Sequence, residues 1–329
     1  MSRQKVLLLG ATGETGGSIL NGLLADKSLN VSVLIREASL EKPATKAIAS
    51  RNVPIIVGDS TADVATLTSL VKGFDVVISA IDAASQLAQA NLVDAAAAAG
   101  VKRFVPCGFM TIVPPGGIML LRDQKEEINN RIFRNHLPYT IIDVGFWHIL
   151  SVLALPSGKS DYVMLAPNAN LFGDGNAPNL LTHLPDIGKF VAEIVKDPRT
   201  LNKRVVTWSD ELSQNQIFDM MEDVSGEKIE RQHVSEEEFK PQLAAARKAF
   251  EEDTSSEGMR LTSIMLHGSE YANSKFFRRD NTLENAKYLG YLDARELYPG
   301  FKPTTFREFL VNELLPGRAE RPYPNLKIH

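Results

Sequence analysis

Residues Lys5 to Gly17 read KVLLLGATGETGG, an apolar run followed by a series of glycines. The run at residues 6–9 is typical of a buried strand, and Gly10, Gly13 and Gly16 follow with the spacing G-x-x-G-x-x-G. Glycines in this position predict a tight turn that opens a helix. Because such a turn leaves backbone N–H groups free at a helix N-terminus, it suits a phosphate group. The stretch therefore predicts a nucleotide site.

Apolar strand-like runs and helical patterns alternate through the first half of the chain. The predicted strands are residues 6–9, 31–35, 53–57, 76–81, 103–106 and 139–144. This alternation predicts an α/β fold with a doubly wound parallel sheet, which binds ligands at the carboxyl ends of its strands. We expect a nucleotide-binding domain over residues 1–152 and a smaller α+β lobe over 153–329. Residues 183–210 are expected to return to the first domain as a helix and a strand.

Local signals mark several helix boundaries. Ser60 with Asp63, and Ser235 with Glu238, have the spacing of a capping box. Amphipathic or capped helices are predicted at residues 86–99, 186–197, 213–226, 235–252 and 305–315. Residues 156–178 are rich in Pro, Gly and Asn, and this composition predicts a loop with one hairpin.

Composition excludes several classes of function. The 329 residues carry a formal net charge of −4, so nothing favours nucleic acid or an anionic membrane as a partner. The single cysteine, Cys107, excludes an intrachain disulfide and a multi-thiolate zinc site, and no metal site is predicted. No secretory signal or membrane span is evident, so a cytoplasmic protein is expected, as a monomer or homodimer.

Arg36 stands where an NAD-binding protein would place an acidic residue. It ends the second predicted strand, about 20 residues after the glycine turn, and a guanidinium there can clamp a 2′-phosphate. This favours NADP(H), with Lys42 and Lys46 as further positive charges and Glu37 pointing away. The alternative is a solvated arginine at a strand end.

The remaining strand ends supply further candidates. Asp59 follows the third strand, where it can reach the adenine edge. The alternative is that this position is a plain turn at Gly58. Small residues at Ala80 and Ile81 leave room for a cofactor. Aromatic residues follow the fifth and sixth strands and are placed around the nicotinamide, with core packing as the alternative. Those aromatic residues are Phe109, Phe146 and Trp147. Cys107 fits a small buried hydrophobe better than a nucleophile.

Lys125 is the catalytic candidate. It shares an apolar helix face with Leu121 and Ile128, while Arg122 and Asn129 are placed on other faces. A lysine on an inward face is costly unless it is paired or lines a cleft, where desolvation lowers its pKa toward neutrality. The alternatives are a salt bridge, for example with Asp123, and a helix end that reaches water.

The Tyr-x-x-x-Lys arrangement of short-chain dehydrogenases is absent from that helix. One copy occurs in the second half at Tyr271 and Lys275, and we interpret it as coincidence, although Tyr271 can still face the substrate.

The chain resembles the NmrA-like and isoflavone-reductase-like group of atypical short-chain dehydrogenases. The matching segments are GATGETGG at residues 10–17, VLIRE at 33–37, VKRFVP at 101–106, DIG at 186–188 and DPRTLNKRV at 197–205, together with Lys125 thirteen residues before Pro138. The resemblance implies a Rossmann domain that binds NADPH, and it makes Lys125 the catalytic lysine. After the fifth strand the group usually carries Ser-Glu-Phe-Gly, whereas this chain has Cys-Gly-Phe-Met at residues 107–110.

These inferences together define the expected site. The residues assigned to the cofactor are Gly10, Thr12, Gly13, Glu14, Thr15, Gly16, Arg36, Lys42, Asp59, Ala80, Ile81, Cys107, Gly108, Phe109, Lys125, Gly145 and Phe146. The residues assigned to the substrate pocket are Phe109, Met110, Trp147, His148, His267 and Tyr271.

The expected activity is NADPH-dependent reduction of an aromatic or polyketide-like small molecule in secondary metabolism. Hydride would pass to an electron-poor carbon of an enone, quinone or quinone methide, while Lys125 stabilises the oxygen that gains charge. One alternative is an NmrA-type regulator that senses NAD(P) without turnover. Another is an isomerase or dehydratase on the same fold.

Overall fold

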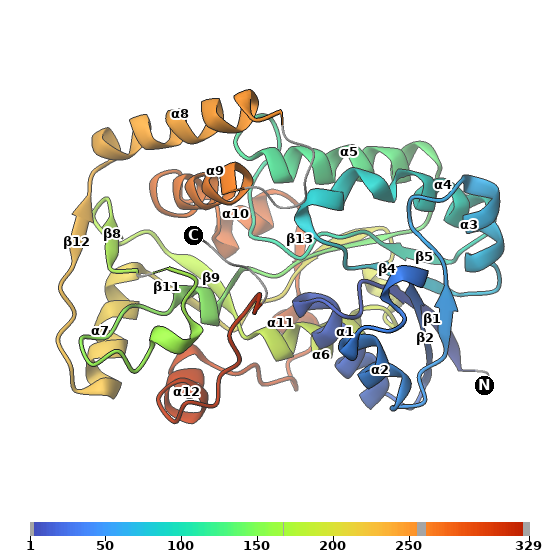
Figure 1. Cartoon of the computed structure of the whole chain (residues 1–329), viewed down its shortest axis with the longest axis horizontal. Helices are drawn as coiled ribbons and strands as arrows, with labels where there is room; N and C mark the ends of the chain where they lie inside the picture. The colour runs from blue at the N-terminus through green and yellow to red at the C-terminus, as the bar shows by residue number, and fades with distance from the viewer. Residues whose placement is uncertain (1–2, 167, 255–260, 325–329) are drawn as a thin grey trace.

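A parallel sheet forms the centre of the computed structural model, which describes residues 3–166, 168–254 and 261–324 (Figure 1). Its first five strands have the spatial order β3-β2-β1-β4-β5. Their bounds are β1 (Gln4–Leu9), β2 (Leu29–Ile35), β3 (Ile55–Val57), β4 (Val76–Ser79) and β5 (Arg103–Val105). A bridge between Phe104 and Tyr139 continues the sheet to β6 (Thr140–Asp143). The resulting order 3-2-1-4-5-6 confirms the doubly wound prediction.

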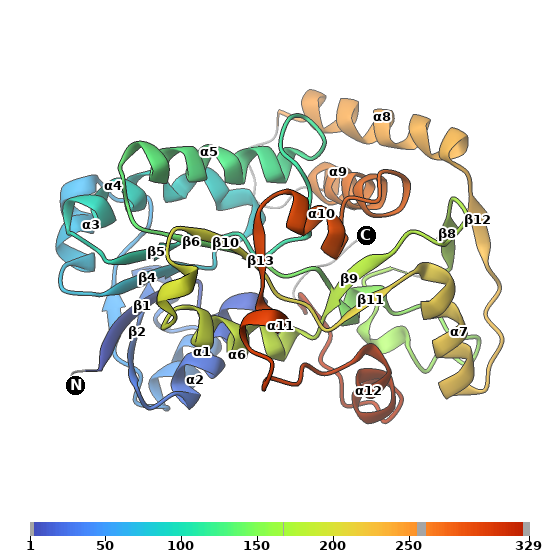
Figure 2. The same ribbon diagram turned by 180° about the vertical axis from the view of Figure 1, so that it is seen from behind.

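Two later strands extend this sheet. β10 (Lys203–Val206) pairs in parallel with β6, and β13 (Tyr291–Asp293) pairs in parallel with β10. Nothing in the sequence pattern indicated β13. Figure 2 shows β10 and β13 beside β6 from behind the molecule. Strands from both halves of the chain therefore form one edge of the sheet.

Helices cover both faces of the sheet, so the apolar side chains of β1 are buried whichever face they point to. Val6 and Leu8 pack with α1 (Glu14–Ala25), α2 (Pro43–Ala49) and α6 (Leu184–Ile194). Leu7 and Leu9 pack on the other face, where the helices are α3 (Val64–Val71), α4 (Ala90–Ala98) and α5 (Leu120–Arg134). Because β1 is buried on both faces, its sequence is a continuous apolar run.

Helix α6, from the second half, lies in backbone contact with α1. A Cβ on Gly22 would lie 2.0 Å from the carbonyl oxygen of Gly188, and a Cβ on Gly188 would lie 1.8 Å from that of Ser18. The Ser18 hydroxyl donates to the carbonyl of Leu184 at 2.6 Å and accepts from the N–H of Gly188 at 2.9 Å. Only glycines permit this approach, which fixes α1 against the second half.

The second lobe contains two small sheets and several helices. β9 (Asn179–Thr182) pairs with β7 (Phe146–Trp147) and with β11 (Asp210–Leu212). β8 (Asn170–Phe172) pairs in parallel with β12 (Gln232–Val234), so the hairpin predicted within residues 156–178 is wrong. The helices are α7 (Gln214–Ser225), α8 (Glu236–Glu252), α9 (Leu261–Ala272), α10 (Leu283–Tyr288), α11 (Ala294–Leu297) and α12 (Phe306–Phe309).

Capping agrees with the sequence at one helix and differs at another. The Ser235–Glu238 capping box is present at the start of α8. In α3, however, the cap is Asp63 itself, whose carboxylate accepts from the N–H of Thr66 at 2.9 Å, so the predicted box with Ser60 is wrong. The helix predicted from residue 86 begins earlier, as a 3₁₀ segment (Ala83–Gln89) capped by Asp82, and α4 follows it.

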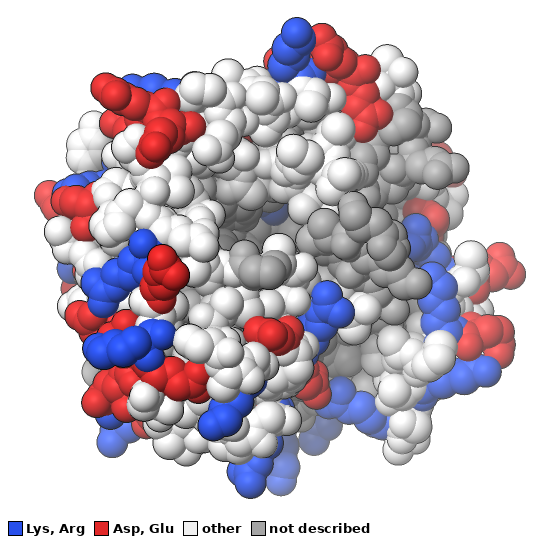
Figure 3. All heavy atoms as spheres, turned by 60° about the vertical axis from the view of Figure 1, so that its left-hand side comes forward, with Lys and Arg blue, Asp and Glu red and all other residues white. Residues whose placement is uncertain are grey.

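The surface carries charges of both signs. Figure 3 shows Lys and Arg intermixed with Asp and Glu around one face, while the described residues beside the hollow near its centre are mostly uncharged. Within the described ranges no helix is long and apolar enough to cross a membrane. In the same ranges no group of His, Cys, Asp or Glu side chains is arranged to hold a metal ion.

Candidate active site

The glycine turn between β1 and α1 forms an open cradle. Gly10 has φ +78°, and a Cβ there would lie 2.2 Å from the carbonyl oxygen of Ala80, while a Cβ on Gly16 would lie 2.0 Å from that of Gly10. Gly13 is the N-cap of α1 and provides no side-chain cap. The first N–H groups of α1 are therefore available to an anion, and Thr12 is exposed beside them.

A groove of about 910 Å³ lies beyond the turn, at the ends of β2 and β3. Arg36, Lys42 and Asp59 line it together, and so does Glu37, which sequence reasoning directed away. The N–H and hydroxyl of Thr61 bond the Asp59 carboxylate and lower its pKa, and the charge of Arg36 acts in the same direction. Lys46 pairs with Glu41 at 2.8 Å and does not line the groove.

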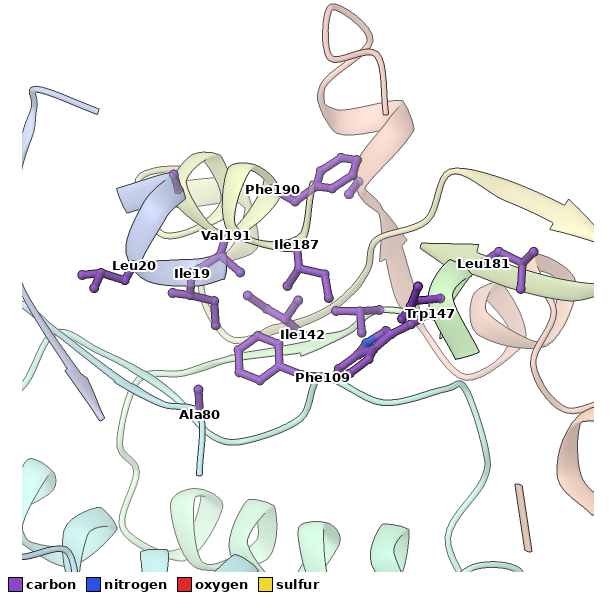
Figure 4. Packing of buried hydrophobic residues seen from close by; sticks show 14 of the residues in the cluster. Ile19, Leu20, Ala80, Phe109, Ile142, Trp147, Leu181, Ile187, Phe190 and Val191 are labelled. Atoms are coloured by element: carbon purple, nitrogen blue, oxygen red, sulfur yellow. The ribbon is translucent and has the colours of Figure 1, made fainter. Parts of the chain in front are cut away.

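The turn after β5 is tightly constrained. A Cβ on Gly108 would lie 2.5 Å from the carbonyl oxygen of Ile142. Phe109 has φ +48°, a left-handed conformation that is strained for a bulky residue, and its N–H donates to the same carbonyl at 2.6 Å. Figure 4 shows Phe109 beside Trp147 in the cluster formed with α1 and α6. The strain fixes an aromatic ring at the carboxyl edge of the sheet.

Lys125 reaches this turn from α5. It is buried, and its Nζ donates to the carbonyl of Cys107 at 2.6 Å and to Oε1 of Gln86 at 3.1 Å. Burial lowers the pKa of Lys125, and the positive charge of Arg122 acts in the same direction. The predicted inward position is present, and the alternative partner Asp123 instead accepts from the N–H groups of Gly116 and Gly117. The third N–H of the ammonium meets only a weak acceptor, the sulfur of Cys107 at 3.8 Å, which a substrate oxygen could replace.

A buried ion pair between Arg122 and Asp143 lies near Lys125, and sequence reasoning missed it. Arg122, placed on an outer face by its polarity, is 1 % exposed and donates to Oδ2 of Asp143 at 2.7 Å and to the carbonyl of Thr111 at 2.9 Å. The hydroxyl of Tyr291 donates to the same carboxylate oxygen at 2.5 Å. The available signal was an acidic residue, Asp143, inside a buried strand. Asn129 is likewise buried, against expectation.

Gln86 is a second residue that the sequence analysis missed. Its side-chain oxygen accepts from Lys125, and its side-chain nitrogen donates to the carbonyl of Asp82 at 2.8 Å. Gln89, three residues later, accepts from the N–H of Cys107 at 3.0 Å. The Cys107 thiol donates to the carbonyl of Ile81 at 3.2 Å, so it is a buried structural group. Glutamines spaced by three residues in a 3₁₀ segment gave no distinctive pattern.

The second lobe covers this edge with aromatic residues. The Tyr271 ring lies 5.8 Å from that of Phe146, and it packs with the cluster that contains Met110. Gly145, at φ +64°, sits where a Cβ would lie 2.8 Å from the carbonyl oxygen of Leu180. Burial lowers the pKa of His267, as does the charge of Lys125, so the two side chains lie close enough to interact.

His148 lies elsewhere, and its assignment to the substrate pocket is wrong. The side chain is completely buried, with Nε2 2.8 Å from the hydroxyl of Ser209 and the ring against Phe306 and Phe309. Burial lowers its pKa well below the usual value, as does neighbouring His183. A 3₁₀ turn (His148–Ser151) directs it into the core beside α12, away from the sheet edge.

Tyr323 contacts the start of α1 beside the glycine turn, which no local pattern indicated. The N–H of Tyr323 donates to Oε1 of Glu14 at 3.0 Å, and its ring stacks on Trp147 with centroids 5.8 Å apart. Burial raises the pKa of Glu14 despite this hydrogen bond. Tyr323 therefore links the start of α1, beside the cradle, to Trp147.

Comparison with known proteins identifies the family. The sequence profile of the NmrA-like family matches residues 2–310. The chain belongs to the NmrA-like family. Asnovolin J 5′,6′-dehydrogenase of Aspergillus novofumigatus (strain IBT 16806) is 39 % identical over 316 residues, covering 95 % of each chain. Phenylcoumaran benzylic ether reductase PT1 of Pinus taeda is 30 % identical over 329 residues, covering 94 % of this NmrA-like chain and 99 % of the reductase.

Solved structures have the same fold as this NmrA-like protein. The complex of leucoanthocyanidin reductase with NADPH from Vitis vinifera has a TM-score of 0.76 at 23 % identity, covering 92 % of this chain and 97 % of that one. The structure described as AtPrR2 with NADP⁺ and (+)pinoresinol has a TM-score of 0.75 at 25 % identity, covering 94 % and 99 %. The Rossmann-type fold of the NmrA-like chain is thereby confirmed.

Proposed function

We propose that the protein is an NADPH-dependent oxidoreductase of secondary metabolism. The glycine cradle fits a pyrophosphate, because the N-cap Gly13 leaves the first backbone N–H groups of α1 without a side-chain cap. Arg36 and Lys42 line the groove beside it, and their positive charges support a 2′-phosphate there. The AtPrR2 complex with NADP⁺, and relatives named as a dehydrogenase and a reductase, support the same cofactor and redox chemistry. When bound, NADPH supplies the hydride.

The position of Lys125 carries the catalytic part of this proposal. It is a buried lysine beside the strained turn at Phe109, with strong bonds to the Cys107 carbonyl and to Gln86 and only a weak third bond, to the Cys107 sulfur at 3.8 Å. Lys125 hydrogen-bonds the substrate oxygen on which negative charge develops. A preorganised donor of this kind is worth about 10²- to 10³-fold in rate. The Arg122–Asp143 pair holds α5 against β6, which keeps Lys125 in position while this charge forms.

The surroundings favour a planar, largely apolar substrate. Phe109, Phe146, Trp147 and Tyr271 surround the sheet edge near Lys125, and aromatic faces of this kind stack on conjugated rings. A hydride acceptor that places charge on an oxygen is a carbon conjugated to a carbonyl. We therefore assign as substrate an enone, quinone or quinone methide within an aromatic or polyketide-like molecule.

The test is NADPH consumption with a panel of enones, quinones and quinone-methide precursors. Wild type is compared with Lys125→Ala and with Lys302→Ala, a substitution at an exposed position. We expect kcat to fall about 10²- to 10³-fold in the first variant only, with NADPH affinity measured separately to establish that each protein is folded. Equal turnover in all three proteins would remove Lys125 from the mechanism.

Other outcomes of the same panel would replace the proposal. Tight NADPH binding without turnover of any substrate would favour the NmrA-type regulator that senses the cofactor. Conversion of a substrate without net NADPH consumption would favour an isomerase or dehydratase.

A further inference from the structure

Lys275 is a second buried lysine of the substrate lobe, and the proposed mechanism does not use it. It belongs to a turn of π-helix (Asn273–Phe277) that continues α9, and it is 6 % exposed. No carboxylate or carbonyl among the described residues accepts from its Nζ. Lysines are almost never buried without a partner, so this one requires an explanation.

Two aromatic faces flank the Lys275 ammonium. Its Nζ lies 3.2 Å from the centroid of the Phe146 ring and 4.7 Å from that of Phe276. The first ring is the one that Tyr271 also contacts, and it precedes Trp147 at the carboxyl edge of the sheet. Lys275 therefore adjoins the aromatic residues to which the substrate is assigned. The rings can stabilise a cation, but they offer no strong hydrogen-bond acceptor.

The backbone around Lys275 is fixed by other residues. The Ser274 hydroxyl donates to Asp280 at 2.9 Å, and the N–H of Asp280 donates back to the carbonyl of Ser274 at 2.9 Å. Arg278 donates to the same carboxylate, so this acidic residue is already paired. Single π-turns inside α-helices occur frequently at functional sites. The turn thus holds a lysine in place without providing a partner for it.

We propose that Lys275 recognises an oxyanion of the substrate, either a carboxylate or the enolate of a 1,3-dicarbonyl. This deepens the proposed function and rests on it, because the substrate is taken to lie between Lys125 and Lys275. Lys125 acts on the oxygen conjugated to the reacting carbon, and Lys275 binds a second, acidic oxygen on the same molecule. Burial lowers the pKa of Lys275 to about 7, and an incoming anion favours the charged form that it needs.

The predicted specificity is measured with 2-naphthoate and 2-naphthamide, which share a ring system and differ in charge. Calorimetric titration into the protein saturated with NADP⁺ is expected to show tighter binding of the naphthoate by about 10- to 100-fold. Lys275→Met should remove this preference and leave the affinity for the amide unchanged, and Lys275→Gln should keep part of it.

Lys125→Met is the matched control, because it removes the other buried lysine of the same site. It should retain the preference for naphthoate over naphthamide. The proposal is overturned if wild type binds both probes equally or binds naphthoate with a Kd above about 10 mM. It is also overturned if Lys275→Met keeps the preference or Lys125→Met loses it. None of these results depends on turnover, so they are distinguishable from a failure of the oxidoreductase assignment.

Discussion

Replacing Gly22 by alanine tests the contact between α1 and α6. The new Cβ would lie 2.0 Å from the carbonyl oxygen and 2.1 Å from the carbonyl carbon of Gly188, both backbone atoms. Ordinary contact begins near 3.4 Å, so the helices would have to separate by more than 1 Å. Overpacking typically costs about 1–3 kcal/mol, and each Ser18 hydrogen bond lost adds about 1 kcal/mol. The helix propensity of alanine returns about 1 kcal/mol. We expect a net loss of about 2–4 kcal/mol in the free energy of unfolding.

Gly17→Ala provides the matched control in the same helix. Its Cβ would lie 3.8 Å from the nearest atom, the carbonyl oxygen of Ala11, so only helix propensity changes. This variant should be stabilised by about 0.5–1 kcal/mol. Urea unfolding followed by circular dichroism measures both. If Gly22→Ala is as stable as Gly17→Ala, the close approach of the two helices is refuted.

Three further substitutions test the groove at Arg36, the buried Arg122–Asp143 pair and the buried Lys275. Arg36→Ser should weaken NADPH binding by about 10- to 100-fold and leave NADH binding nearly unchanged, as fluorescence titration would measure; equal losses would contradict the 2′-phosphate assignment. Asp143→Asn leaves Arg122 with an uncompensated buried charge, so urea unfolding should show a loss of about 3–5 kcal/mol, and a loss below about 1 kcal/mol would contradict the pair. Burial lowers the pKa of Lys275 from 10.5 to about 7, so between these values the unfolded chain binds more protons and wild-type stability rises with pH. The free energy of unfolding of Lys275→Met should therefore exceed that of wild type by roughly 3–5 kcal/mol below pH 7, and the difference should shrink toward pH 10. A pH-independent difference would contradict the depressed pKa.

The fold was largely predictable because its signals are local. Apolar runs such as residues 6–9 and the glycine turn after them depend on neighbouring residues alone. The inward position of Lys125 followed from helical periodicity in the same way. The proposed boundary near residue 152 stays a prediction. Strand β13 could not be predicted, because its pairing partner β10 lies far away in sequence.

Parts of the site depend on contacts that periodicity cannot show. Arg122 was placed outward because it is charged, yet Asp143 on a neighbouring strand makes its burial possible. His148 was placed in the pocket because it follows Trp147, but the backbone turns into the core at that point. Tyr271 and Lys275 have a spacing that arises easily by chance, and only the tertiary position of Phe146 gives Lys275 a proposed role.

The contact of Tyr323 with Glu14 bears on where the protein can be labelled. A bulky label at Tyr323 would lie beside the glycine turn and Trp147 and compete with molecules that bind there. Residues 3 and 4 lead into the amino end of β1, at the opposite end of that strand from the glycine turn (Figure 1). A label at residue 3 therefore leaves the turn clear, and kinetic constants obtained with labels at the two positions are not interchangeable.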